Sequence, residues 1–573
     1  MICEACKHEN EAGVKFCSKC GEKTGATPAP GTIEVVPEAD AAPAVKPEEA
    51  LVATSAPEAK PSTPAAPASS SLASTVESIK QMPPKKLAIF GGGIAAVIIL
   101  LIIIIAAASG GSRFDMRQNS ITFLREGSEI IVLGNNNRFT IDGRYNSSQV
   151  SMDGSRAAVL TDWSSANGGT LWFVTTSRAT LVAEDVFSFT LSNTGRGIIF
   201  YTDRIGGDWR TTLNLYETNN SRLTRISEDA HFEASTISPD GRTVAFVVAH
   251  DARGNEITGY MRVNNRNPER LGDNILPIAV SNGGRHLYYI REDETGRESF
   301  HVRSGRNSNR LIPEIGRTPP TIMFNNDYSQ IMFTMDGRTF FSRNGSERER
   351  VSALEIQGLL VPPNTQVNLR HGFIQTYGVS TFANQVALSV DSNWETRLEV
   401  IDRRFEASMI SGTAGLRDAH ISENGRTLLF VNRSGHLMSV DPTNNNPEAT
   451  EIARNLRFFV ASSDASHVYF INSDNELMHV RGNRTPTRIA DFASHLVMSP
   501  RGNRAFFITD MGRNGGDLQT SNNGGRPSRV ATEVMSVTAT PTSVLYRNFD
   551  SDVYRSNGNA NFSRVAADAI ANW

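Results

Sequence analysis

The most constraining feature of this chain is a short phrase that returns again and again from about residue 114 onward. Its clearest copy is "ISPDGRTVAFVVAHD" from residue 237, in which a polar turn ending in glycine precedes a run of β-branched and aromatic residues. Copies begin near residues 151, 191, 237, 280, 324, 382, 421, 461, 498 and 538, those at 324 and 382 being weaker. A recurrence of roughly 40 residues is the signature of a repeat architecture.

Each phrase predicts a tight turn followed by a covered strand. Gly241 follows Asp240 in the best copy, and glycine permits the positive φ that a tight hairpin needs. Residues 244–248 are apolar at every position, as in a strand that is buried on both faces. A second hairpin follows each phrase, for example "LNLYETNNSRLTRIS" from residue 213. Four strands in about 43 residues match one blade of a propeller.

These paired phrases resemble the WD40-like repeats of the TolB family of periplasmic propeller proteins. The resemblance runs through most of residues 114–573 and implies a mainly β chain with a β-propeller, but no particular partner. Ten blade-like units exceed the usual four to eight. Residues 351–373 break the rhythm and mark a possible division, so one large ring and two rings both remain open. A parallel β-solenoid is the alternative, although it would show shorter periods and fewer hairpins.

All four cysteines of the chain stand within its first twenty residues: Cys3, Cys6, Cys17 and Cys20. Paired Cys-x-x-Cys turns supply the four thiolates of a structural, tetrahedral Zn²⁺ site, in which no coordination position stays open for catalysis. Two disulfides are the alternative, but cross-links between adjacent cysteines of this kind would stabilise so short a peptide poorly. In a segment of this size metal binding would itself supply the folding energy.

The same segment resembles the short zinc-ribbon domains found at the N-termini of bacterial proteins. The residues that carry the likeness are the cysteine pairs, Phe16 and Gly21, and the chain departs from the pattern at Lys7, where the family usually has glycine. Residues 1–25 hold four lysines and four glutamates, so they form no basic patch for nucleic acid. We therefore expect this zinc ribbon to contact a protein.

The residues after the cysteines predict a tether and a membrane span. Residues 26–84 are rich in Pro, Ala, Glu and Ser and lack aromatic residues, a composition typical of a disordered linker. The 22 residues from Leu87 to Ala108 carry no charge and would form a helix long enough for a bilayer core. A buried helix or a cleaved signal peptide is the alternative. Gly92 and Ala96 hint at weak helix–helix self-association.

Cysteine placement indicates the orientation of this span. Zinc thiolates need a reducing compartment, whereas the 460 or so residues after the span contain no cysteine. Lys85 and Lys86 directly precede the apolar run, and this favours the same orientation slightly. We expect a cytoplasmic N-terminus and an extracytoplasmic C-terminal domain in the cell envelope.

The region after the span contains no recognisable catalytic motif. It lacks a G-x-S-x-G elbow and paired metal-binding histidines, and its repeats leave no room for another domain. All nine lysines lie at or before Lys86, so its basic residues are all arginines, nearly balanced by acids. Arginines can serve interblade ion pairs or bind phosphate and carboxylate polymers. The sequence thus favours a scaffold or signalling adaptor that binds a protein or envelope ligand. The rival is a lyase or hydrolase with its site at the propeller axis.

Overall fold

The structure is a computed structural model that describes residues 120–567 and the backbone of the strand at Ala569–Ile570. Short gaps fall at residues 135–136, 205–208, 252–255, 317–319, 362–366, 371–373, 445–446, 483, 500–501, 541–542 and 568. All described residues belong to one compact unit, Ala68–Trp573. The four cysteines, the predicted linker at 26–84 and the apolar segment at 87–108 lie outside the described residues. Within the described part, no helix is long and apolar enough to cross a bilayer.

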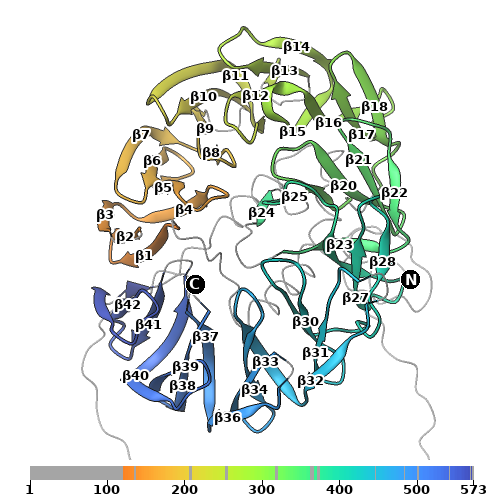
Figure 1. The fold of residues 1–573 in the computed structure, drawn as a ribbon. Coiled ribbons are helices and arrows are strands. Elements are labelled where there is room, and N and C mark those ends of the chain that lie inside the picture. The colour runs from red at the N-terminus through yellow and green to blue at the C-terminus, as the bar shows by residue number, and fades with distance from the viewer. Residues whose placement is uncertain are drawn as a thin grey trace, which may run out of the picture. The chain divides into compact units, whose positions relative to one another are not determined.

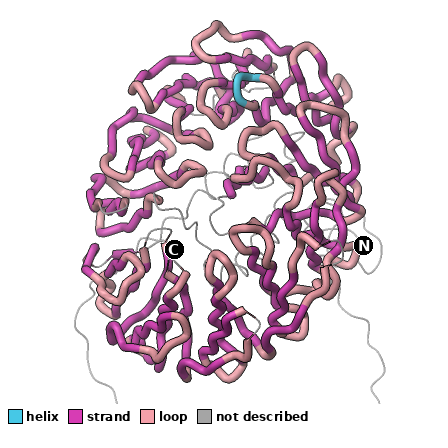
Figure 2. Tube along the Cα trace, viewed as in Figure 1, coloured by secondary structure: helices cyan, strands magenta, loops and turns pink. Residues whose placement is uncertain are grey.

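The described chain is mainly β, and its four-stranded antiparallel sheets are consistent with propeller blades (Figure 1). Six sheets have four strands, one has six and two have seven. Each seven-stranded sheet consists of two four-stranded units that share one long strand, and the six-stranded sheet is one such unit with an added hairpin. Figure 2 shows that strands make up most of the described secondary structure. The one helical element among the described residues is the short turn η1 (Asn282–Gly284). The described residues therefore form eleven four-stranded modules, numbered here in chain order.

The first half of the chain builds modules 1 to 6. Module 1 comprises β1 (Thr122–Glu126), β2 (Glu129–Leu133), β3 (Arg138–Asp142) and the last strand, β44 (Ala569–Ile570). Module 2 comprises β4 (Tyr145–Val150), β5 (Arg156–Ser164), β6 (Gly168–Thr175) and β7 (Ala179–Val186). Modules 3 and 4 comprise β8 (Ser188–Leu191), β9 (Gly197–Thr202), β10 (Arg210–Glu217), the shared β11 (Arg222–Ile237), β12 (Thr243–Ala249), β13 (Ile257–Val263) and β14 (Glu269–Asp273). Module 5 comprises β15 (Ile275–Val280), β16 (His286–Glu292), β17 (Glu298–Ser304) and β18 (Asn307–Ile312), and module 6 β19 (Ile322–Phe324), β20 (Gln330–Met335), β21 (Arg338–Arg343) and β22 (Glu349–Ser352).

The second half builds modules 7 to 11. Module 7 comprises β23 (Glu355–Leu360), β26 (Gln385–Val390), β27 (Thr396–Ile401) and β28 (Ala407–Met409), and the added hairpin is β24 (Val367–Arg370) with β25 (Ile374–Tyr377). Module 8 comprises β29 (Asp418–Ile421), β30 (Leu428–Val431), β31 (Leu437–Val440) and β32 (Thr450–Ala453). Module 9 comprises β33 (Leu456–Ala461), β34 (His467–Asn472), β35 (Leu477–Arg481) and β36 (Thr487–Ala490). Modules 10 and 11 comprise β37 (Ala493–Met498), β38 (Arg504–Gly512), β39 (Gly515–Asn522), the shared β40 (Ser528–Ala539), β41 (Val544–Asn548), β42 (Val553–Ser556) and β43 (Ser563–Ala566).

Eleven apolar clusters join these modules, one at each contact between successive modules. Strand β12 shows how. Val244 and Phe246 point into the cluster shared with module 3, whereas Ala245 points into the cluster shared with module 5. A strand that supplies apolar side chains to both faces has no polar alternation. The expected burial of residues 244–248 is confirmed at 244–247, whereas Val248 is only partly buried.

The succession of modules closes on itself at the two ends of the described chain. Strand β44 pairs with β1 through Arg125 with Ile570 and Glu126 with Ala569. An apolar cluster packs β1 and β2 against β41 and β42, so module 11 contacts module 1 (Figure 1). We call this contact the seam. The ten sequence phrases correspond to modules 2 to 11, and the eleventh module is assembled from both ends of the chain.

The first and third connections of each module lie on the same face because neighbouring strands are antiparallel. We call it the glycine-turn face, after turns such as those at Gly154, Gly195 and Gly241. Gly241 has a φ of 76°, which confirms the expected positive φ at this turn. Hydrogen bonds link successive turns. The amide of Met152 donates to the carbonyl oxygen of Asn193 (2.7 Å), and the amide of Thr194 donates to the carbonyl oxygen of Pro239 (3.0 Å).

The break in sequence rhythm at residues 351–373 corresponds to an insertion within module 7. After β23 the chain forms β24 and β25 before it continues into β26. Strand β25 pairs in parallel with β19 of module 6, and Figure 1 shows the hairpin on the inner side of β20. An apolar cluster that includes Met323, Phe341 and Ile356 packs modules 6 and 7 directly together, so the contacts between modules continue across the break.

Candidate functional site

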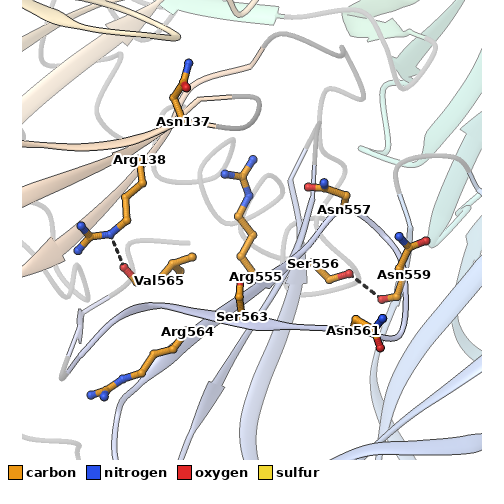
Figure 3. A pocket seen from close by; sticks show the side chains of 10 residues that line it. All are labelled: Asn137, Arg138, Arg555, Ser556, Asn557, Asn559, Asn561, Ser563, Arg564 and Val565. Atoms are coloured by element: carbon orange, nitrogen blue, oxygen red, sulfur yellow. Dashed lines mark hydrogen bonds between the residues drawn. The ribbon is translucent and has the colours of Figure 1, made fainter.

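A polar pocket of about 430 Å³ opens beside the seam (Figure 3). One wall comes from the start of β3, where Asn137 and Arg138 lie. The other comes from the end of β42, the β42–β43 connection and the start of β43. Both the β2–β3 and β42–β43 connections are third connections of their modules, so the pocket lies on the glycine-turn face. We call it the seam pocket.

Arg555 is the central side chain of this pocket. It stands at the end of β42, and in Figure 3 its guanidinium rises between Asn137 and Asn557. Its Nη2 donates a hydrogen bond to the carbonyl oxygen of Gly134 at 2.7 Å. Burial lowers the pKa of the Arg555 guanidinium, because a charged group loses hydration there. An arginine remains protonated at neutral pH, so the pocket holds a partly desolvated positive charge.

Two further arginines border the pocket but are ion-paired outside it. Nε of Arg138 donates to the carbonyl oxygen of Val565 at 2.8 Å, and its Nη2 lies 3.7 Å from Oε2 of Glu126. Nη2 of Arg564 lies 2.7 Å from Oδ1 of Asp552. Figure 3 shows the Arg564 side chain directed away from Arg555. Both therefore contribute less net charge to the pocket than their number suggests.

Amide and hydroxyl groups complete the lining. Asn557, Asn559 and Asn561 come from the β42–β43 connection and are exposed. Ser556 is buried beneath them and donates from Oγ to the carbonyl oxygen of Asn559 at 2.7 Å. Asparagine and glycine suit such a connection because they tolerate tight turns. The exposed amides can donate and accept hydrogen bonds to a ligand that Arg555 attracts.

None of the ten described lining residues is an aspartate, glutamate or histidine. General acid–base catalysis at neutral pH uses such groups in most enzymes. The lining instead combines guanidinium, amide and hydroxyl groups, which suits the binding of an oxyanion.

His231, His250 and His286 each contact a neighbouring side chain within or beside their own sheet. Nδ1 of His286 hydrogen bonds to Oγ of Ser304, and Nε2 of His250 to Oγ1 of Thr258. The ring of His231 stacks on Trp209 at 5.2 Å between centroids. Within the described residues, no group of three or more His, Cys, Asp or Glu side chains is placed to hold a metal ion. The proposed zinc ligands Cys3, Cys6, Cys17 and Cys20 lie outside the described part.

Sequence reasoning missed the seam pocket because its two walls are more than 400 residues apart in the chain. It noted that arginine replaces lysine after the span, but no local pattern joins Arg138 to Arg555. The usable signal was the likeness of "GNNNR" from residue 134 and "RSNGNANFSR" from residue 555. Both are asparagine-rich segments beside arginines, and pairing of the chain ends brings Arg138 and Arg555 to one pocket.

Comparisons with known proteins give similarity at the level of structure alone. No family model matches the sequence, and no curated protein matches it. A eukaryotic initiation factor structure is similar with a TM-score of 0.39 and 15% identity, covering 65% of this chain and 95% of that one. The tricorn protease gives 0.24 and 11%, covering 80% and 63%. TolB from Acinetobacter baumannii gives 0.25 and 13%, covering 41% and 63%.

The chain thus spans less than two thirds of the length of the tricorn protease and TolB structures. All three proteins are β-propeller proteins, and the similarity to them concerns the fold. With TM-scores below 0.5, none of these similarities bears on what this chain binds or does.

Proposed function

We propose that this chain is a single-pass membrane protein that binds an envelope ligand outside the cytoplasm and a second partner inside it. The described modules would form the extracytoplasmic binding domain. A structural zinc ribbon at Cys3, Cys6, Cys17 and Cys20 would contact a protein in the cytoplasm, at the end of the 26–84 tether. The segment at 87–108 would span the membrane and support weak self-association. The protein would then act as a scaffold or signalling adaptor.

The observation that carries the binding role is the seam pocket. Arg555 presents a partly buried charge to a space rimmed by exposed amides, and none of the described residues that line this space is acidic or a histidine. Such a lining favours retention of an anionic ligand over its chemical conversion. The β-rich modules contribute a rigid frame, because each is packed on both sides by apolar clusters.

The topology is tested by proteolysis of intact spheroplasts that contain the full chain. Protease added outside should degrade the described modules and spare residues 1–25. The cytoplasmic segment should hold one equivalent of zinc, which Cys17→Ser should release. Degradation of residues 1–25 with protection of the modules would contradict the orientation, and full zinc retention in Cys17→Ser would contradict the metal site.

The binding role is tested with envelope fractions and the full-length protein. If the protein is a binder, it should retain envelope material saturably and release no altered product. Arg555→Gln should lower this retention at least tenfold. Repeated conversion of envelope material to a released product would instead support the enzyme alternative. If Arg555→Gln left this conversion unchanged, the enzymatic site would lie outside the seam pocket. A melting curve of Arg555→Gln that overlaps the wild type shows that lost retention does not reflect unfolding.

A further inference from the structure

We propose that the seam pocket binds the phosphodiester group of an anionic membrane lipid. This inference rests on the proposed membrane anchoring and names the ligand class of the same site. Three independent features carry it: the side of the domain on which the pocket opens, the length of chain between the domain and the predicted span, and the balance of charge around Arg555.

The pocket opens on the side at which the chain enters the domain. Strand β1 begins on the glycine-turn face, where the amide of Ile121 donates to the carbonyl oxygen of Gly154 at 3.0 Å. The β2–β3 connection of the same module returns to this face and supplies Asn137 and Arg138 to the pocket. Chain entry and pocket therefore share one face and one module.

The length of chain before β1 limits how far this face can lie from the membrane. From Ala108, the end of the predicted span, to Ile121 there are 13 residues. A fully extended chain covers at most about 3.3–3.6 Å per residue, which gives roughly 45 Å. A face within that reach of the bilayer can meet lipid headgroups directly.

The charged side chains of the described pocket lining are all arginines, which suits an anionic ligand. Arg138 and Arg564 each lie beside one carboxylate, Glu126 and Asp552 respectively, outside the pocket lining. Arg555 adds a third positive charge and donates its 2.7 Å hydrogen bond to a carbonyl oxygen. The guanidinium of Arg555 gives the pocket a positive charge, which the negative charge of a phosphodiester complements. A guanidinium fork also fits the paired oxygens of a phosphate.

The neighbouring polar groups suit the rest of such a headgroup. Asn557, Asn559 and Asn561 are exposed around the mouth of the pocket and offer donors and acceptors for the hydroxyl groups of a glycerol headgroup. The acyl chains would stay in the bilayer, because the polar lining offers them no apolar surface. The pocket would thus hold the domain in one orientation on the membrane.

The test uses the full-length chain in an uncharged detergent and measures binding by calorimetric titration. The probes are dioctanoyl phosphatidylglycerol, dioctanoyl phosphatidylcholine and soluble glycerol 3-phosphate. We expect saturable binding of phosphatidylglycerol, at least tenfold tighter than that of either other probe. Arg555→Gln should weaken it at least tenfold. Asn557→Asp, which places a negative charge at an exposed position, should weaken it several-fold without a change in melting temperature.

Arg433→Gln is the matched control. Arg433 lies in the β30–β31 connection on the opposite face, with a side chain that is 79% exposed. Its loss should leave lipid binding unchanged. Equal binding of phosphatidylcholine, or equal loss of binding in Arg433→Gln and Arg555→Gln, would overturn the proposal. Equally tight binding of glycerol 3-phosphate would identify a soluble ligand and overturn the assignment to a lipid. The titration in detergent does not depend on membrane topology. A failed titration would therefore contradict lipid binding, whereas a failed protease experiment would contradict the proposed orientation.

Discussion

The contact between modules 5 and 6 and the contact at the seam perform the same structural task by different means. Thirteen buried residues form the first, and five of them are aromatic: Tyr288, Phe300, Phe324, Tyr328 and Phe333. The seam cluster contains six buried residues, all aliphatic. Aromatic side chains bury the largest areas, so apolar burial stabilises the first contact much more than the second.

The seam compensates with polar contacts between the chain ends. Arg138 donates to the carbonyl oxygen of Val565, and Arg555 to that of Gly134. The amide of Ala567 donates to Oε1 of Glu126 at 2.9 Å. Hydrogen bonds of this kind contribute about 1 kcal/mol each, and they leave polar groups near solvent. Of these two contacts, the one with less apolar burial is the one that borders a polar pocket.

The largest expected effect is the difference in unfolding free energy lost when a buried side chain is truncated at each of these two contacts. Phe300 is fully buried in the cluster between modules 5 and 6. Phe300→Ala should lower the free energy of unfolding by about 3–5 kcal/mol, through lost burial and the cavity that remains. Val553→Ala, at a fully buried position in the seam, should cost only about 2 kcal/mol. Urea denaturation of both variants measures the difference, and equal losses would contradict the ranking of the contacts.

A third contact, between modules 9 and 10, differs from both because it contains titratable polar groups. Nδ1 of His467 and Nε2 of His479 lie 3.0 Å apart, and the His479 ring lies 4.6 Å from that of Tyr469. The hydroxyl of Tyr469 in turn accepts a hydrogen bond from the amide of Gly524 in the next module. Burial, with His467 and Arg481 nearby, lowers the pKa of His479 to about 4.

Stability should therefore fall as the pH drops from about 6.5 towards 4. In this range the unfolded state protonates His479 while the folded state keeps it neutral, so protons favour unfolding. The full effect of this shift is on the order of 3 kcal/mol. Urea titrations at pH 7 and pH 4.5 should show a smaller pH dependence in His479→Gln than in the wild type. The same pH dependence in both proteins would show that His479 is not responsible.

The smallest effect distinguishes two turns with the same backbone but different neighbours. Gly241 and Gly425 have φ values of 76° and 71° in equivalent glycine turns. A Cβ at Gly241 would lie 2.5 Å from the amide nitrogen of Gly197, whereas one at Gly425 would meet nothing within 4 Å. Alanine at either position costs about 1 kcal/mol for the positive φ. Gly241→Ala should cost roughly 1–2 kcal/mol more, because backbone must move.

Melting temperatures of the two alanine variants measure this difference. A larger fall in Gly241→Ala is expected, since the turns of modules 3 and 4 touch while the turn of module 8 is open at this point. Equal melting temperatures would mean that contacts between neighbouring turns do not contribute to the packing of the modules.

The sequence predicted the repeated sheets well where a glycine marks the turn, as at Gly241. Its signal was weaker in the copy from residue 324, where tertiary contacts impose the same turn geometry on another residue. Tyr328 and Ala465 occupy the equivalent turn positions with φ values of 60° and 58°. Tyr328 can adopt this conformation because it is buried and packs against Phe324. Such a compensating contact leaves no local sequence signal.

The pairing of the two chain ends and the seam pocket could not be predicted from the sequence either, because both depend on contacts between distant residues. Module 1 contains no copy of the repeated phrase, and its fourth strand comes from the other end of the chain. Arg138 and Arg555 meet only once this closure has formed. The inserted hairpin β24–β25 was visible only as a break in rhythm, because its pairing with β19 is set by the neighbouring module.

Hydrogen exchange of the full-length chain, followed by mass spectrometry, tests whether the seam pocket is the ligand site. The measurement compares the protein with and without dioctanoyl phosphatidylglycerol. We predict slower exchange in peptides that cover residues 129–142 and 553–567, and unchanged exchange in peptides from modules 5 and 6. Slower exchange only at modules 5 and 6, or no change anywhere at a saturating lipid concentration, would contradict the account.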